Sequence, residues 1–185
     1  MEHITTFTGE DFTPLTPDIN KIHIEDIAHA LSLMCRANGH FDYFYSVAQH
    51  SINCVNEAKA CNYSARIQMA CLIHDASEAY ISDITRPVKQ HLHEYKIIEA
   101  RLQSIIYEKY LGSNLLEDEN DLIFQIDNNM LISEFNSLMS RKKVFTETPT
   151  IYSTPVFEYK DHKETETEFL KTYYGILHAG LIQGK

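Results

Sequence analysis

The stretch Ile73-His74-Asp75-Ala76-Ser77-Glu78-Ala79-Tyr80-Ile81-Ser82-Asp83 joins a histidine and three acidic residues to the end of an apolar run. A helix over residues 64–80 would place His74 and Glu78 one turn apart on one face, with Asp75 beside them. Imidazole and carboxylate groups hold borderline divalent metals, and a further carboxylate nearby can handle the proton of a reacting water. The stretch therefore predicts a metal site.

The same helix face argues that this site is buried. His74 and Glu78 continue the helical stripe of Ile67 and Cys71, and Ser64 is suited to cap the start of the helix. Polar or charged groups on a core stripe cost free energy unless they are paired or bound to metal. This conflict with the local rule indicates a functional position.

The composition predicts one soluble domain over residues 1–185. Of the 185 residues, 44% are hydrophobic and 23% charged, and the net charge is -10. An acidic chain argues against a nucleic-acid partner or an anionic membrane surface, both of which need Lys and Arg. No apolar run is long enough to span a membrane, and the 4 cysteines form no Cys-x-x-Cys pair. We therefore expect a cytoplasmic protein with buried, reduced thiols.

Helical spacing of apolar residues predicts an all-α fold of five to six or more helices around one core. We expect an irregular arm or a short hairpin over residues 1–20, a helix break at Pro87, and irregular structure or short strands over residues 141–165. The predicted helices cover residues 24–35, 46–60, 64–80, 93–110, 117–138 and 166–181.

Further polar residues fall near or on inward helix faces. His50 lies one turn from Val47 and Cys54, and Asp127 lies among Ile126 and Met130. His50 could be a hydrogen-bonded core residue or a ligand, and Asp127 a capping residue or a ligand. The roles of two cationic residues are also left open. Arg36 could simply oppose the dipole of its helix, and Lys89 could lie in a solvated loop.

Taken together, Arg36, His50, His74-Asp75 and Asp127 resemble the H…HD…D constellation of the HD-domain phosphohydrolase superfamily. The segments Phe44-Tyr45-Ser46-Val47-Ala48-Gln49-His50-Ser51 and His74-Asp75-Ala76-Ser77-Glu78-Ala79-Tyr80 are similar to its short, single-domain, phage- or prophage-type branch, and so are residues 24–32. Deoxynucleotide 5′-phosphohydrolases and phage dATP triphosphohydrolases belong near that branch.

The resemblance implies a role for each matching position. The metal ligands would be His50, His74, Asp75 and Asp127, with Asp121 as the competing choice for the last aspartate. The acidic pair that manages the water would be Glu78 and Asp83. Phosphate contacts would come from Arg36 and Lys89, and His40 could contact the base.

The implied function is a divalent-metal-dependent hydrolase of (deoxy)nucleoside 5′-phosphates, either a dNTP (dATP-type) triphosphohydrolase or a dNMP 5′-nucleotidase. The metal (Zn, Co, Mn, Mg or Fe) stays open, and a homo-oligomer is possible. The alternatives are a dinuclear iron oxygenase of the same fold, for which His91 and His93 would supply extra ligands, and a nucleotide sensor without turnover.

Overall fold

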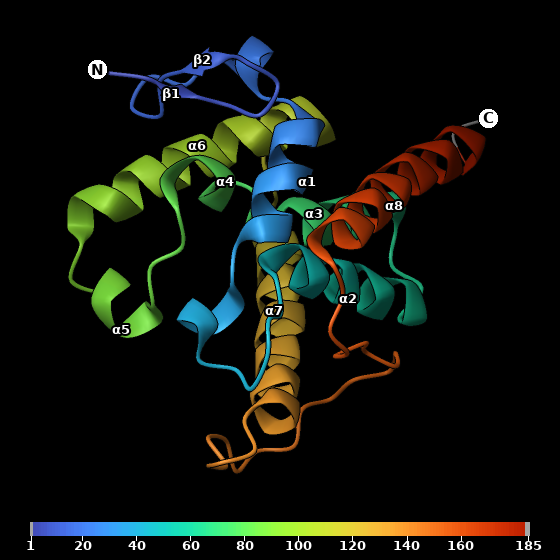
Figure 1. The fold of residues 1–185 in the computed structure, drawn as a ribbon. Helices are drawn as coiled ribbons and strands as arrows, with labels where there is room; N and C mark the ends of the chain where they lie inside the picture. The colour runs from blue at the N-terminus through green and yellow to red at the C-terminus, as the bar shows by residue number, and fades with distance from the viewer. Residues whose placement is uncertain (1, 184–185) are drawn as a thin grey trace.

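The computed structural model describes residues 2–183, and these are mostly helical (Figure 1), so the prediction of an all-α fold is confirmed. The elements follow in the order β1 (Ile4–Thr5), β2 (Asp11–Phe12), η1 (Ile19–Lys21), α1 (Ile24–Leu33), η2 (Arg36–Gly39), α2 (Val47–Ala60), α3 (Ala65–Ile73), α4 (Glu78–Ile81), α5 (Arg86–Lys89), α6 (His93–Leu111), α7 (Glu117–Leu138) and α8 (His162–Gln183).

Helix α2 lies at the centre of the molecule. It packs against α1, α3, α7 and α8, and most of its residues are buried. Its start is fixed by a capping box: Ser46 Oγ accepts from the Gln49 N–H at 3.1 Å, and Gln49 Oε1 accepts from the Ser46 N–H at 3.1 Å. Because α2 is covered on nearly every side, its polar side chains must find partners inside the protein.

The prediction of one helix over residues 64–80 is wrong, because α3 ends at Ile73 and α4 begins at Glu78. Continuing α3 would need a hydrogen bond from the Ser77 N–H to Ile73 O, but the Gln103 side chain of α6 binds both of these groups. Its Nε2 donates to Ile73 O at 2.8 Å, and its Oε1 accepts from the Ser77 N–H at 3.1 Å. A side chain inserted into the ladder breaks a helix. The chain between them closes tighter turns, such as Ala76 N–H to Ile73 O at 3.0 Å.

The predicted helix break at Pro87 is also wrong. Helix α4 ends earlier, at Ile81. The next residue, Ser82, has a φ of 68° and a ψ of 159°, a backbone conformation that residues other than glycine rarely adopt. Pro87 instead lies in the first turn of the short helix α5. Proline is tolerated there because the first N–H groups of a helix have no partner within it.

Several helices begin or end at residues that are typical of helix termini. Ser64 caps α3 by accepting from the Ile67 N–H at 3.3 Å, and Gly112 closes α6 with a φ of 77°. Helix α8 begins at His162, one turn earlier than predicted. The fully buried core side chains come from most helices and include Ile27, Leu31, Val55, Leu72, Ile73, Leu102, Ile106, Met130 and Phe169.

The N-terminal arm forms a short antiparallel hairpin of β1 and β2 that docks on α1. The Thr8 N–H and Oγ1 donate to Asp26 at 2.7 and 3.0 Å. Phe7 stacks on His29 with ring centroids 3.8 Å apart, and Phe12 is fully buried against Tyr80. These contacts attach the arm to the helical body.

Residues 139–161, between α7 and α8, form no helix or strand, so the short strands considered for this region are absent from it. Residues 150–160, here called the strap, run along α2, which supplies polar partners at successive turns. Gln49 Nε2 donates to Glu158 O at 3.1 Å, and Asn53 accepts from and donates to the Val156 backbone at 3.0 Å. Glu57 accepts from the backbone N–H groups of Tyr152 and Ser153.

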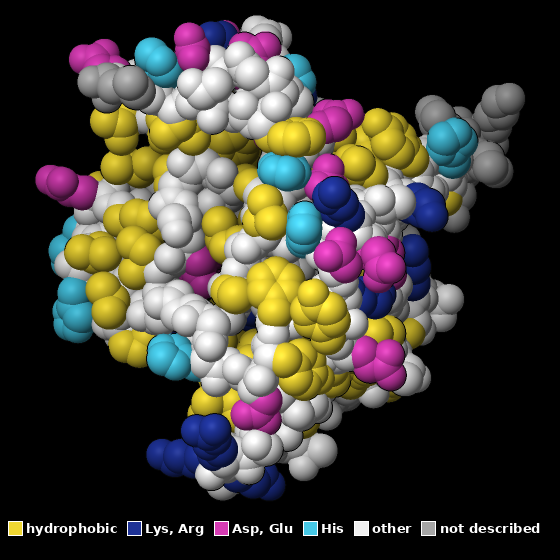
Figure 2. All heavy atoms as spheres, viewed as in Figure 1, with side chains coloured by type: hydrophobic (Ala, Val, Ile, Leu, Met, Phe, Trp, Pro, Cys, Tyr) yellow, Lys and Arg dark blue, Asp and Glu magenta, His cyan; other side chains and the backbone are white. Residues whose placement is uncertain are grey.

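The cysteines are all free, as expected, but they are not all buried. Cys54 and Cys71 are buried, whereas Cys35 is exposed because α1 ends two residues before it. Figure 2 shows Lys and Arg side chains gathered at the lower end of the molecule, where Figure 1 places the loop after α7. No helix within residues 2–183 combines the length and apolarity that crossing a bilayer requires.

Candidate metal centre

The structure brings the four predicted ligands to one point, from α2, the turn after α3, and α7. His50 Nε2 lies 3.2 Å from His74 Nε2, 3.2 Å from Asp127 Oδ1 and 3.9 Å from Asp75 Oδ2. His74 Nε2 lies 3.4 Å from Asp75 Oδ2 and 3.9 Å from Asp127 Oδ1. Asp121, the competing choice for the last position, is exposed.

When the two histidines are neutral, as metal ligands must be, their hydrogen bonds leave both Nε2 atoms as acceptors. His74 Nδ1 lies 2.8 Å from Cys71 O, which can only accept, so Nδ1 carries the proton. His50 Nδ1 lies 2.6 Å from Glu134 Oε1 and donates in the same way. Two lone pairs then face each other, with carboxylate oxygens around them. Only a cation or a proton between these donors makes the arrangement favourable, so the donor set fits a divalent metal.

Glu134, which was not among the predicted site residues, supports this centre through its hydrogen bond to His50. It is fully buried and also accepts from Tyr45 OH at 3.0 Å and Arg36 Nε at 3.2 Å. Burial acts to raise the pKa of Glu134, but the charges of His50 and Arg36 outweigh it and lower the pKa. The signal in the sequence was an acidic residue on the inward stripe of α7, which otherwise carries Ile123, Ile126, Met130 and Leu138.

Arg36 offsets part of the negative charge of the acidic side chains that surround the histidines. Besides Glu134, it contacts Asp75 Oδ2 through Nη1 at 3.2 Å and Asp127 Oδ1 through Nη2 at 3.4 Å. A guanidinium has five N–H donors, and partners within residues 2–183 engage three of them, which leaves two for another anion. The two residues after it, Ala37 and Asn38, have positive φ values of 53° and 50°.

Glu78 and Asp83 lie beside the centre. Glu78 is buried, and its Oε2 has no hydrogen-bond partner among the described residues. Burial, followed by the charges of Asp75 and Asp83, raises the pKa of Glu78 well above its ordinary value. A buried carboxyl group with a raised pKa can hold or pass on a proton near neutral pH.

The predicted substrate-binding residues are only partly gathered here. Lys89 pairs with Glu99 and lies over the Tyr95 ring, and burial acts to lower its pKa while Glu99, Glu78 and Asp83 raise it. Arg86 lies nearer to the ligands, with Nη2 3.9 Å from Asp127 Oδ2. His40 is exposed, and within residues 2–183 no hydrogen bond or ion pair links its side chain to the centre.

A thiol also borders the histidines. Cys54 Sγ lies 3.6 Å from His50 Nε2, and Cys54, His50 and His74 place one ligand atom each within 4.8 Å of one another. His91 and His93, the extra ligands that an iron oxygenase would need, are both exposed and lie outside this cluster.

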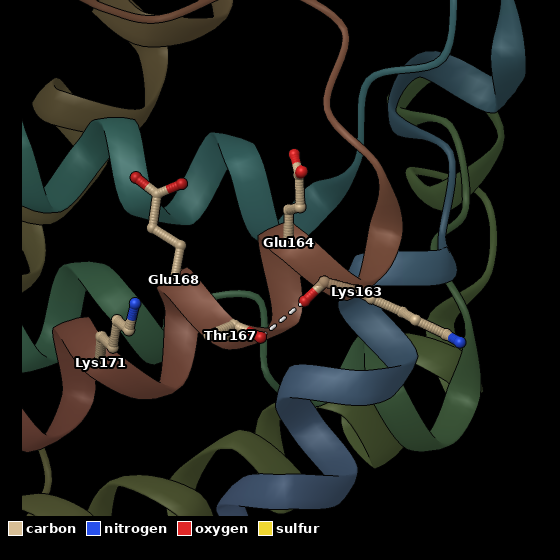
Figure 3. Close-up of a pocket in the computed structure, with 5 residues that line it drawn as sticks. All are labelled: Lys163, Glu164, Thr167, Glu168 and Lys171. Atoms are coloured by element: carbon tan, nitrogen blue, oxygen red, sulfur yellow. Dashed lines mark hydrogen bonds between the residues drawn. The ribbon is translucent and has the colours of Figure 1, made fainter.

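A hollow on the surface of α8 is a separate feature. Figure 3 shows that its lining comes from one helix, and within it Thr167 Oγ1 donates to Lys163 O at 2.8 Å. Its lining residues are Lys163, Glu164, Thr167, Glu168 and Lys171. None of the candidate site residues borders it. Mixed charges on two turns of one helix are typical of a solvated face.

Comparison with known proteins assigns the chain to a family. A family model described as HD domain matches residues 36–175, which include every candidate ligand. The chain belongs to the HD domain family. It is also similar to the uncharacterized protein YfdR of Escherichia coli, with 40% identity over 60% of this chain, and to the uncharacterized protein RCAP_rcc00048 of Rhodobacter capsulatus, with 34% identity over 56% of it.

The matched segments span 59% and 55% of those two relatives. The chain therefore matches less than two thirds of the length of either curated relative. The buried cluster of His50, Cys54 and His74 indicates a metal site.

Proposed function

We propose that this protein is a divalent-metal-dependent hydrolase of (deoxy)nucleoside 5′-phosphates, acting as a dNTP triphosphohydrolase of the dATP type or as a dNMP 5′-nucleotidase. The proposal rests on the convergence of His50 and His74, whose Nε2 atoms face each other at 3.2 Å beside two carboxylates. We assign His50, His74, Asp75 and Asp127 as the ligands. The ion supplies Lewis-acid polarisation of the phosphoryl group and a lowered pKa for the attacking water.

The protein's own groups divide the remaining tasks. Glu78 accepts the proton of the attacking water, because its unpartnered Oε2 and raised pKa suit a general base. Asp83, whose charge acts on Glu78, orients that water or protonates the leaving oxygen. Arg36 retains two free N–H donors for the phosphoryl oxygens, on which negative charge is concentrated.

The cations after α4 complete the phosphate contacts. Lys89 is our assigned residue, although its pairing with Glu99 means that it must exchange partners to reach a substrate. Arg86 has an exposed side chain next to Asp127 and offers a second cation at the same place. A substrate with several phosphate groups, such as a dNTP, would use both.

The deciding experiment incubates the Mn²⁺- or Co²⁺-loaded protein with a panel of nucleoside mono- and triphosphates and separates the products by chromatography. Release of tripolyphosphate and a nucleoside identifies a triphosphohydrolase, and release of phosphate from a dNMP identifies a nucleotidase. Asp75→Ala is the inactive control. Nucleotide binding without any phosphate product would overturn the proposal in favour of a sensor. Oxygen consumption with two irons per chain would favour an oxygenase.

A further inference from the structure

The buried thiol of Cys54 has no role in the proposed hydrolysis, yet it lies next to the two histidine ligands. It occupies α2 one turn after His50, so both side chains leave the same helix face. Its Sγ contacts His50 at Nε2, the nitrogen that faces the other ligands, and not at the nitrogen bound to Glu134. The thiol therefore borders the space in which an ion would lie.

The spacing of these atoms matches a tetrahedral metal site. Bonds of about 2.3 Å to sulfur and about 2.05 Å to nitrogen, at the tetrahedral angle, place these two donors about 3.6 Å apart, and two nitrogens about 3.3 Å apart. The structure has 3.6 Å between Cys54 Sγ and His50 Nε2, and 3.2 Å between the two Nε2 atoms. The third side, between Cys54 and His74, is within 4.8 Å. A modest movement of the thiol closes the triangle.

We propose that Cys54 is a conditional metal ligand that selects thiophilic cations: with Zn²⁺ or Cd²⁺ its thiolate joins His50 and His74, whereas with Mn²⁺ it stays unbound. Thiolates favour zinc and related soft ions, and carboxylates favour manganese and magnesium. When the sulfur–metal bond forms, the thiol proton passes to the buffer. Three protein donors with sulfur among them, joined by Asp75 or Asp127, make a closed site of the kind zinc occupies structurally.

This inference rests on the proposed metal centre, and the test separates the two. The metal-free wild-type protein is titrated with Cd²⁺, and ultraviolet absorption follows the sulfur-to-cadmium charge-transfer band. Affinities for Zn²⁺ and Mn²⁺ are measured by calorimetry in the wild type, in Cys54→Ser and in Cys71→Ser. Cys71 is the matched control, because it is also a fully buried thiol but lies outside the donor cluster.

We expect the cadmium band in the wild type and in Cys71→Ser, and its loss in Cys54→Ser. Zn²⁺ affinity of Cys54→Ser should fall by at least about tenfold, the lower end of what losing even an outer-shell partner costs. Its Mn²⁺ affinity should change by less than about threefold, which also shows that this variant folds.

Two results would overturn the inference while leaving the centre intact. The first is Mn²⁺ binding by the wild type without a cadmium–sulfur band, and the second is a band that persists in Cys54→Ser. A wild-type protein that binds neither Mn²⁺ nor Cd²⁺ would overturn both the metal centre and the role of Cys54.

Discussion

Replacing Gln103 with leucine removes the side-chain amide that ends α3 just before His74. The wild-type amide makes two hydrogen bonds, to Ile73 O and from the Ser77 N–H. Each is worth about 1 kcal/mol net, and a backbone group left unpaired in a buried place costs about 1–3 kcal/mol. If the turn keeps its shape, Ile73 O still accepts from the Ala76 N–H. Only the Ser77 N–H is then left unpaired, so Gln103→Leu should lower the free energy of unfolding by about 2–4 kcal/mol.

A second response is open to the chain, and it has a different signature. Without the amide, the Ser77 N–H can bond Ile73 O and continue α3, which removes most of the stability loss. Tight turns advance by about 120° per residue and an α-helix by about 100°, so over four residues the direction of Glu78 relative to His74 would change by up to about 80°. Metal affinity and turnover would then fall, because the ligands and the proton acceptor no longer face one point.

Urea unfolding of the metal-free protein and Mn²⁺ calorimetry distinguish these responses. Gln68→Leu is the matched control, since Gln68 also bonds a backbone carbonyl, Tyr63 O at 2.8 Å, but lies near the start of α3. It should cost about 1 kcal/mol and leave metal affinity unchanged. If Gln103→Leu alters stability by less than about 0.5 kcal/mol and metal affinity by less than about twofold, the role assigned to the amide is wrong.

Three further predictions concern single positions. Glu78→Gln should lower kcat by about 10²- to 10⁴-fold while Mn²⁺ affinity is retained, as measured by chromatography of the products and by calorimetry. Ser82→Gly should relieve backbone strain worth about 1–3 kcal/mol, less about 0.5–1 kcal/mol of glycine entropy, and so raise Tm by a few degrees. Glu57→Gln should cost about 1–3 kcal/mol at pH 7 in urea unfolding, because the strap N–H groups donate to a charged carboxylate.

The Glu57 prediction also has a pH dependence. Burial acts to raise the pKa of Glu57, but hydrogen bonds from Ser153 and Tyr152 lower it. Its contribution to stability is thus complete above its unfolded pKa of about 4.3 and is lost as the pH falls through the lower folded pKa. The difference between Glu57→Gln and wild type should shrink in acid, and a difference that stays constant down to about pH 2 would contradict this assignment.

For Ser82 and Glu78 the controls lie in the same segment. Ser77→Gly replaces a serine in helical conformation, with φ of -60°, and should destabilise by about 0.5–1 kcal/mol where Ser82→Gly stabilises. Asp75→Ala should lose Mn²⁺ binding and turnover together. Near-full activity in Glu78→Gln would remove Glu78 from proton transfer.

Local patterns in the sequence were sufficient for most helices because their caps and apolar stripes are local. Ser46, Ser64 and Gly112 end or begin helices where the sequence indicates. The break after Ile73 could not be predicted in this way. Its cause is an amide thirty residues further along the chain, and residues 64–80 taken alone have a continuous helical period.

The site shows the same division. His74 and Glu78 stood out as polar groups on an apolar stripe, and Glu134 carried the same signal on α7 without being given a role. The convergence of His50 and Asp127 on His74 needed the resemblance to a family, because no local rule connects three separate helices. The contact between Cys54 and His50 could be inferred only from structure, since a buried cysteine one turn from a histidine is ordinary in a core.

Because α2 side chains bind the main chain of the strap, the strap should tolerate more substitutions than α2 does. Gln49, Asn53 and Glu57 form hydrogen bonds to main-chain atoms of residues 150–160. These atoms are the same whatever side chains the strap carries. Substitutions in the strap should therefore be tolerated widely, except at Ile151 and Phe157, whose side chains pack on the core. Proline at positions 150, 152, 153 or 156 should also be harmful, because it would delete a hydrogen-bonded N–H. Gln49, Asn53 and Glu57 should tolerate few substitutions, because their side-chain hydrogen bonds hold the strap over α2.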